Sequence, residues 1–214
     1  MATPHRALRT PTAPAPRPHR PSLVPPPGAG EPRPAAAAVL DELLAGNARY
    51  ARGHARRVYG RPTGRRPHAV VLGCVDAPAP PELVLDQALG ELLCIRTAGQ
   101  VLDEAVLGSA QYGVQELGAP LVLVLGHERC AAVAATLERL RTGAPVPDHL
   151  ELLVEEIAPA ARRTRGRPGD WAEHTLRAQT TWVRDAIRAD PAFGAAGVVA
   201  ARLDAGSGLV SLLP

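Results

Sequence analysis

The stretch that decides the fold is HAVVLGCVD, residues 68–76, together with PLVLVLGHERC, residues 120–130. Each stretch begins with a short aliphatic run, and side chains that can bind a metal follow directly. Continuous aliphatic runs of this length are typical of strands that are buried on both faces of a parallel sheet. We therefore predict two buried strands, over 68–73 and 120–126, with polar side chains at their carboxyl ends.

Helical periodicity alternates with these strands along the chain. Apolar residues recur at helical spacing in five segments, which we expect to be helices: 35–54, 101–118, 128–143, 149–165 and 170–190. The remaining expected elements are a short helix over 83–90, a strand over 91–99, and two last strands around a turn at 205–208. Alternating strands and helices favour right-handed crossovers, so the predicted fold class is α/β, with a mostly parallel β-sheet flanked by helices.

Composition divides the chain into a tail and one domain. Residues 1–34 are about one-third proline and hold five arginines but one acidic residue. Such a segment has little apolar surface to bury, so we expect it to be disordered. An anion-binding arm is the alternative, but the segment lacks the interleaved aromatic residues that would lead us to expect nucleic acid. Residues 35–214 are long enough for a single domain.

Cysteine content and hydropathy bear on the compartment. The chain has three cysteines, an odd and small number that does not fit a disulfide framework. No apolar run is long enough for a transmembrane helix, and the N-terminus has no signal-peptide pattern. We therefore expect a reduced, cytoplasmic protein with no membrane partner.

Two cysteines and a histidine stand at the carboxyl ends of the predicted strands. Cys74 follows one strand, His127 follows the other, and Cys130 is expected in the first turn of the next helix, three residues after His127. Ligands bind at this edge of a parallel sheet, and a helix N-terminus favours the thiolate form of cysteine. Two cysteines and one histidine with an open fourth position are typical of catalytic zinc. A buried core thiol is the other interpretation of Cys74, and it is the one we favour for Cys94.

Three segments of the chain resemble the β-class carbonic anhydrases, whose motifs are C-x-D-x-R and H-x-x-C. The segments are LLAGNARYARG, GCVDAPAPPELVLDQALGELLCIRTAG and GSAQYGVQELGAPLVLVLGHERCAAV. The resemblance covers 35–214 and implies a zinc-containing α/β fold, a homodimer that can pair into a tetramer, and reversible hydration of carbon dioxide to bicarbonate. It also implies one Zn²⁺ per subunit, held by Cys74, His127 and Cys130. Asp76 then matches the catalytic aspartate, and Gly99 is assigned to substrate binding.

The chain departs from the family pattern at three positions. Pro78 replaces the arginine of C-x-D-x-R, which in the family pairs with the aspartate and holds it off the metal. Arg65 stands in place of a glutamine, and Gln100 in place of an asparagine. Without its arginine, Asp76 is expected to be able to bind zinc as a fourth ligand and close the site. Arg65 and Arg96 are candidates for the missing cation.

These departures leave three functions open. The first is a carbonic anhydrase, either fully working or weakened by loss of the arginine, in which Asp76 orients the attacking hydroxide. The second is a zinc-binding pseudoenzyme with a binding or regulatory role, in which Asp76 stays on the metal. The third is a related hydrolase of carbonyl sulfide or carbon disulfide, which are linear molecules like carbon dioxide.

Overall fold

The structure, a computed structural model, describes residues 34–55 and 66–214. Nearly all of the predicted tail, and Arg65, lie outside the described residues. The division of the chain into 1–34 and 35–214 therefore stays a prediction. None of the helices in the described ranges combines the length and the apolar character needed to cross a bilayer.

The strands of the described residues form one sheet in the order β2-β1-β3-β4-β5. Their bounds are β1 (Ala69–Cys74), β2 (Leu92–Thr97), β3 (Leu121–His127), β4 (Gly197–Leu203) and β5 (Val210–Leu213). The strands β1 to β4 run parallel to their neighbours, and β5 runs antiparallel to β4. The predicted α/β class with a mostly parallel sheet is confirmed.

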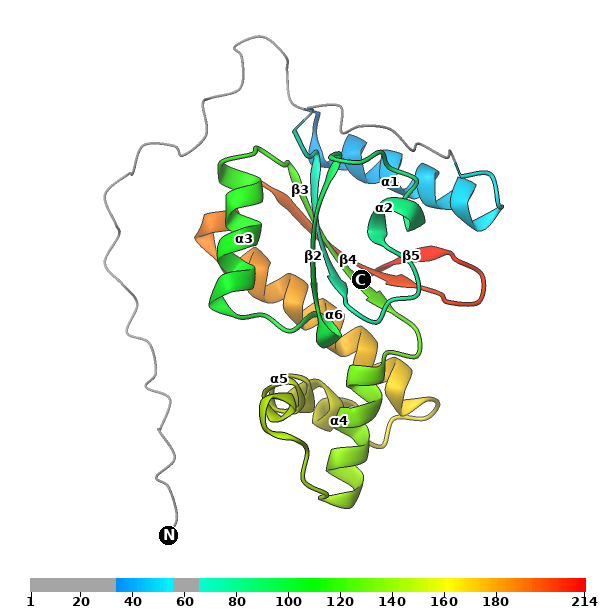
Figure 1. Ribbon diagram of the computed structural model, residues 1–214, viewed down its shortest axis with the longest axis vertical. Coiled ribbons are helices and arrows are strands. Elements are labelled where there is room, and N and C mark those ends of the chain that lie inside the picture. Colours follow the sequence, from blue (N-terminus) through cyan, green and yellow to red (C-terminus); the bar gives the residue numbers. More distant parts are fainter. Residues whose placement is uncertain (1–33, 56–65) are drawn as a thin grey trace, which may run out of the picture.

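Helices cover both faces of this sheet (Figure 1). The α-helices of the described residues are α1 (Ala36–Ala51), α2 (Pro81–Val84), α3 (Glu104–Gln115), α4 (Ala131–Thr142), α5 (Asp148–Thr164) and α6 (Trp171–Ala189). Two 3₁₀ turns, η1 (Ala98–Gln100) and η2 (Pro191–Phe193), follow β2 and α6. The helices α1 and α2 pack on one face and α3 and α6 on the other, while α4 and α5 extend beyond the carboxyl ends of the strands.

Side chains of β1 alternate between two apolar cores. Ala69 and Val71 belong to the core beneath α1 and α2, and Val70 and Leu72 belong to the core beneath α3 and α6. A strand that is buried on both faces needs apolar residues at every position, which explains the continuous aliphatic run in the sequence. The same arrangement places β1 and β3 at the centre of the sheet, with their carboxyl ends side by side.

The helix expected over 83–90 is wrong in position. The structure has α2 at Pro81–Val84 instead, because proline fits the first position of a helix, where no N–H donor is needed. Asp86 has a left-handed backbone (φ 52°), which a continuing right-handed helix excludes. The segment up to Gly90 is therefore a series of turns that leads into β2.

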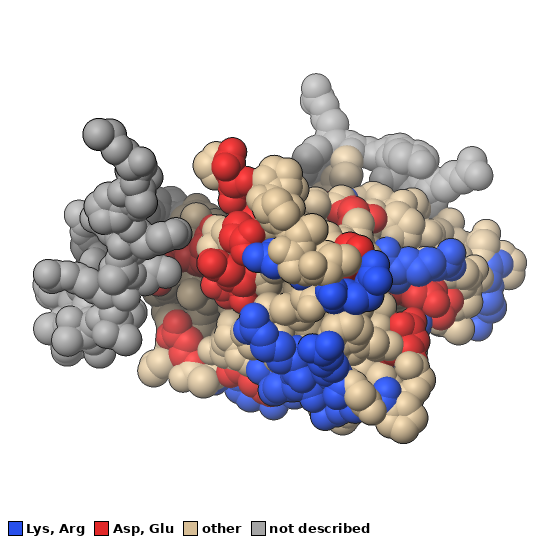
Figure 2. Space-filling model, turned by 90° about the horizontal axis from the view of Figure 1, so that it is seen from below, with Lys and Arg blue, Asp and Glu red and all other residues tan. Residues whose placement is uncertain are grey.

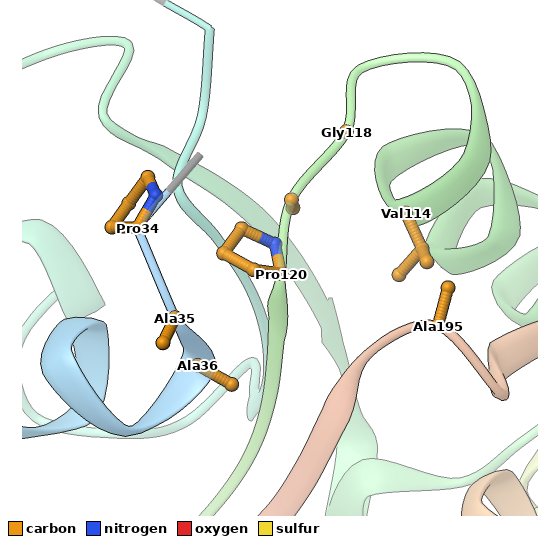
Figure 3. A pocket seen from close by; sticks show the side chains of 8 residues that line it. Pro34, Ala35, Ala36, Val114, Gly118, Pro120 and Ala195 are labelled. Atoms are coloured by element: carbon orange, nitrogen blue, oxygen red, sulfur yellow. The ribbon is translucent and has the colours of Figure 1, made fainter. Parts of the chain in front are cut away.

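A small apolar cavity lies at the amino ends of β3 and β4. Its volume is about 260 Å³, and Figure 3 shows it between the start of α1 and the end of α3. The cavity is lined by Pro34, Ala35, Ala36, Val114, Gly118, Ala119, Pro120 and Ala195. None of these residues has a titratable side chain, so the cavity offers no group for acid–base chemistry. The candidate site lies at the opposite edge of the sheet.

Candidate metal centre

Cys74, Asp76, His127 and Cys130 converge at the carboxyl ends of β1 and β3. One ligand atom from each residue lies within 4.8 Å of the ligand atoms of the others. The two cysteine Sγ atoms are 3.7 Å apart. Cys74, His127 and Cys130 are buried, and Asp76 closes the group on its solvent side. The four side chains form a cluster that could hold one metal ion.

The structure corrects the expected position of Cys130. This residue does not lie in the first turn of a helix; it is the N-cap of α4 and has extended backbone angles (φ −61°, ψ 122°). Between His127 and Cys130 the chain turns through Arg129, which has a left-handed backbone (φ 58°). A turn, and not helical spacing, therefore brings the imidazole and the thiol together.

The Asp76 carboxylate lies among the other ligand atoms. Its Oδ1 accepts a hydrogen bond from Cys74 Sγ at 2.6 Å and lies 2.7 Å from His127 Nε2. Its Oδ2 accepts a hydrogen bond from the backbone N–H of Ala131 at 2.7 Å. Ala131 is the first residue of α4, and the first N–H groups of a helix have no partner within the helix. The start of α4 therefore holds the carboxylate facing inward.

No cation holds Asp76 outward in the described part of the chain. Pro78 has neither a charge nor a backbone donor. The guanidinium of Arg96, a candidate replacement, binds carbonyl groups of the 74–77 turn instead. It donates at 2.8, 3.0 and 3.1 Å to the oxygens of Cys74, Val75 and Ala77. Of the two candidates for the missing cation, Arg96 therefore fixes the backbone of the turn instead of pairing with Asp76, and Arg65 lies outside the described residues.

Gly99 supports the sulfur of Cys74. The strand predicted over 91–99 ends at Thr97, and in the following turn Gly99 is left-handed (φ 66°). Its N–H donates a hydrogen bond to Cys74 Sγ at 3.2 Å. A Cβ atom at this position would lie 2.5 Å from Cδ1 of Ile157, so a larger residue would require the Ile157 side chain to shift. The assignment of Gly99 to substrate binding stays a prediction.

Hydrogen bonds distribute protons unevenly over the two thiols. The contact with Cys130, together with burial, raises the pKa of the Cys74 thiol. The same contact lowers the pKa of Cys130, and N–H groups at the start of α4 add to this effect against the cost of burial. Cys130 is therefore the sulfur that more readily becomes a thiolate, the form that binds metals.

The imidazole and the carboxylate stabilise each other in charged form. Burial disfavours the charge on Asp76, but hydrogen bonds from Cys74 and Ala131 and the nearby imidazole keep its pKa below the usual range. Burial also disfavours the charge on His127, but Cys74 and Asp76 raise the pKa of the ring above its usual value. Metal ligands must lose their protons, so metal binding at this cluster is expected to release protons.

The second nitrogen of His127 is held by the backbone. Its Nδ1 lies 3.0 Å from the carbonyl oxygen of Glu128, which leaves Nε2 facing the other ligand atoms. A hydrogen bond of this kind fixes the tautomer and the orientation of a metal-binding histidine. A carbonyl or carboxylate at the second nitrogen is expected for a histidine that binds a metal, but the sequence does not show which group supplies it. The sequence gives no signal for the donor at Ala131, because it is a backbone group that any residue could supply.

Cys94 lies outside the cluster, as predicted. It is half-buried in β2 and packs against the core beneath α1 and α2. Burial, and then the proximity of Glu82, raises the pKa of its thiol. These surroundings favour a neutral core thiol over a ligand.

Two thiols, an imidazole and a carboxylate in one cluster are the ligands that zinc prefers. The family model for carbonic anhydrase matches residues 69–191, which include all four side chains. The chain belongs to the β-class carbonic anhydrase family. Carbonic anhydrase 2 of Mycobacterium tuberculosis is 43% identical to it over 101 residues, which are 47% of this chain and 49% of the relative. The chain thus spans about half the length of the curated relatives that it matches.

Solved structures of β-carbonic anhydrases have the same fold. CafA of Aspergillus fumigatus superposes with a TM-score of 0.62 at 19% identity, over 83% of this chain and 89% of that one. A tetrameric β-carbonic anhydrase of Sordaria macrospora superposes with a TM-score of 0.61 at 16% identity, over 83% of this chain and 94% of that one. The resemblance expected from the sequence is confirmed, and the fold of the protein is that of this class.

Proposed function

We propose that the protein is a zinc-dependent carbonic anhydrase that catalyses the reversible hydration of carbon dioxide to bicarbonate. The observation that carries the proposal is the convergence of Cys74, Asp76, His127 and Cys130 to within 4.8 Å, inside the segment that the family model matches. In this proposal Cys74, His127 and Cys130 hold one Zn²⁺ per subunit. When bound, zinc supplies acidity that makes hydroxide available from water near neutral pH.

Asp76 has two tasks in the proposed mechanism. Facing inward, it occupies the position of a fourth ligand and excludes water from the cluster. Facing outward, it leaves room for water and can accept a hydrogen bond that orients the attacking oxygen. Its lowered pKa keeps the carboxylate charged, and thus an acceptor, at neutral pH. Because Pro78 cannot hold the outward position, we expect the inward one to dominate and the activity to be low.

The surroundings of the cluster suit a small apolar substrate. The two cysteines pack in a buried cluster with apolar side chains: Val101, Val133, Ile157 and Leu176. Carbon dioxide has no net charge and no dipole, so apolar walls can admit it while they exclude competing water. Gly99, whose N–H already reaches Cys74, is the residue that we propose to contact the substrate.

A zinc-binding pseudoenzyme is the second candidate, and a specific contact favours it. The hydrogen bond from Ala131 N–H to Asp76 Oδ2 stabilises the inward carboxylate without any metal. If the carboxylate keeps this position at every pH, zinc is bound by four protein groups and serves to stabilise the fold. The protein then acts through a binding or regulatory role.

We further propose a cytoplasmic homodimer that can pair into a tetramer, with neither nucleic acid nor membrane as a partner. The three cysteines are free thiols, which a reducing compartment preserves. Tetramers are known for the related enzymes of Sordaria macrospora. Val75 and Leu89, on segments that adjoin the edge strand β2, are exposed apolar side chains that an interface would cover.

Stopped-flow hydration of carbon dioxide, with zinc content measured on the same sample of the full chain, tests the proposal. We expect the zinc-loaded protein to hydrate carbon dioxide faster than the Cys130→Ser variant. This variant lacks one proposed ligand and should retain less zinc. A zinc-loaded protein that is inactive at every pH would contradict the enzyme proposal and support the pseudoenzyme. Turnover of carbonyl sulfide without hydration of carbon dioxide would instead point to the related hydrolase.

A further inference from the structure

The helix α5 presents a solvent-facing stripe on which charge changes sign halfway. Leu152, Glu155, Pro159 and Arg162 are exposed and recur at spacings of three or four residues, so they lie on one side of the helix. The opposite side is buried against the rest of the molecule, through Val154, Ile157, Ala158 and Ala161. Glu156 and Arg163 flank this side, so acidic residues occupy the first half of the stripe and arginines the second.

The charges of this stripe lack ionic partners within residues 34–55 and 66–214. Glu155, Arg162 and Arg163 are exposed and Glu156 is partly exposed. The ion pair that α5 makes in those ranges is a long one, 3.9 Å between Glu151 and Arg139. Figure 2 looks onto the end of the molecule that carries α4 and α5 and shows arginine side chains gathered in the lower centre of that face, with acidic side chains on either side of them.

The helix dipole accounts for part of this distribution. Acidic residues are favourable near the start of a helix and basic residues near its end, but the effect fades within the first and last turn. Glu155 and Glu156 lie in the middle of α5, beyond its first turn. The separation of charge along the stripe therefore extends further than the helix dipole favours. When a second copy of the stripe is turned end for end, its arginines face the acidic residues of the first copy.

We propose that α5 binds α5 of a second copy of this chain, antiparallel, about a two-fold axis at Pro159. Glu155 and Arg162 are seven residues apart, and so are Glu156 and Arg163, so the two members of each pair lie on the same side of the stripe. Each pair is centred within one residue of Pro159. Reversal of one helix about Pro159 therefore sets Glu155 of one copy beside Arg162 of the other, and Glu156 beside Arg163. Two-fold symmetry then repeats both pairs.

Apolar and small residues fit the same arrangement. Leu152, which is 52% exposed, lies seven residues before Pro159, and Gly166 lies seven residues after it. Because α5 ends at Thr164 and Gly166 has a left-handed backbone, Leu152 of one copy faces the turn after α5 of the other, where Gly166 lies. No atom lies within 4 Å of the place where a Cβ of Gly166 would stand, so the leucine has room. At the axis, the exposed Pro159 rings meet without a charge.

The association is expected to be weak and sensitive to salt. Exposed ion pairs contribute little each, and ions at physiological strength screen them. The pairing does not depend on the metal cluster, and α5 lies at the far end of the molecule from the amino ends of the strands. The α5–α5 contact is therefore separate from any dimer that forms through another surface, and it can join two such dimers.

Charge reversal with complementation tests the pairing by sedimentation velocity on the full chain. Glu155→Arg with Glu156→Arg makes the stripe all positive, and Arg162→Glu with Arg163→Glu makes it all negative. We expect each double variant alone to dissociate by one two-fold step, with a dissociation constant raised at least about tenfold. An equimolar mixture of the two variants should regain the wild-type mass, because every contact is then a pair of opposite charges.

The mixture separates specific pairing from damage to the fold, since misfolded variants would not recover. Glu104→Arg, an exposed charge reversal at the start of α3, is the control and should keep the wild-type mass. Two results would overturn the proposal: double variants that keep the wild-type mass, or a mixture that stays dissociated. Wild-type mass that does not change between low and high salt would also overturn it.

Discussion

Oδ1 of Asp76 lies 2.7 Å from Nε2 of His127. The carboxylate thus stands where a metal ligand would stand, and not where a second-sphere acceptor would be held off the metal. Two features of the chain account for this position. The N–H of Ala131 binds the other carboxylate oxygen, and Pro78 leaves the opposite side without a cation. Whether water can reach the cluster depends on which is stronger: the hold of Ala131 on the inward carboxylate, or the pull of a group on the side of residue 78.

Pro78→Arg should therefore raise the rate of carbon dioxide hydration. An arginine at this position can pair with Asp76 and draw the carboxylate away from the ligand atoms. Because an oriented acceptor contributes roughly a hundredfold or more to proton transfer, we expect at least a tenfold rise in kcat at equal zinc content. Stopped-flow assays of carbon dioxide hydration on zinc-loaded samples measure this rise in kcat. Pro80→Arg adds the same charge two residues further on and should leave the rate unchanged. Equal rates for all three proteins would show that Asp76 does not limit the reaction.

Arg96→Met should loosen the turn that carries Cys74 and Asp76. The guanidinium donates to three carbonyl groups of this turn, and hydrogen bonds from a charged donor contribute roughly 1.5–3 kcal/mol each. Since part of the group is exposed, we expect a loss of about 2 kcal/mol in the free energy of unfolding, measured in denaturant. Arg96→Lys keeps the charge but not the planar fork, so it should recover less than half of the loss. Full recovery by lysine would mean that charge alone holds the turn.

Gly99→Ala should destabilise the protein through its backbone and through a clash. An alanine with φ near 66° costs about 1–2 kcal/mol, and its Cβ would meet Ile157 at 2.5 Å. We expect a total loss of about 3 kcal/mol in the free energy of unfolding. Gly108→Ala is the matched control, because nothing lies within 4 Å of that position in α3, and it should stabilise the helix by up to about 1 kcal/mol. A neutral Gly99→Ala would contradict the tight packing of the turn.

The sheet was predictable because its signal is local. The aliphatic runs at 68–73 and 120–126 reflect burial on both faces, and they coincide with β1 and β3. The end of α2 was not predictable, because it depends on a contact from far along the chain. The side chain of Asp86 is 1% exposed and pairs with Arg49 of α1 at 2.5 Å. A contact of this kind leaves no trace in the pattern around 83–90.

The candidate site divides in the same way. Residue types at the strand ends were sufficient to single out Cys74, His127 and Cys130, because few side chains bind zinc. The turn at Arg129 and the donor at Ala131 were not predictable, since both depend on backbone geometry. Loss of the motif arginine at position 78 did indicate that Asp76 could face inward.

Asp204→Asn should weaken the β4–β5 turn in a manner that depends on pH. Hydrogen bonds from Ser207 and then from Arg202 hold the pKa of Asp204 well below its usual value of 3.8. A lowered pKa in the folded state means that the charged form stabilises the fold above the pKa of the unfolded chain, and that this contribution is lost as the pH falls. The variant should therefore unfold at a lower denaturant concentration than the wild type at pH 7. This gap between the two unfolding midpoints should narrow progressively as the pH falls below about 3.8. Asp41→Asn on α1, whose carboxylate is exposed, is the control and should show no such gap. A gap for Asp204→Asn that is the same at pH 7 and at pH 2.5 would mean that the amide disturbs the turn by its shape, and not by the loss of charge.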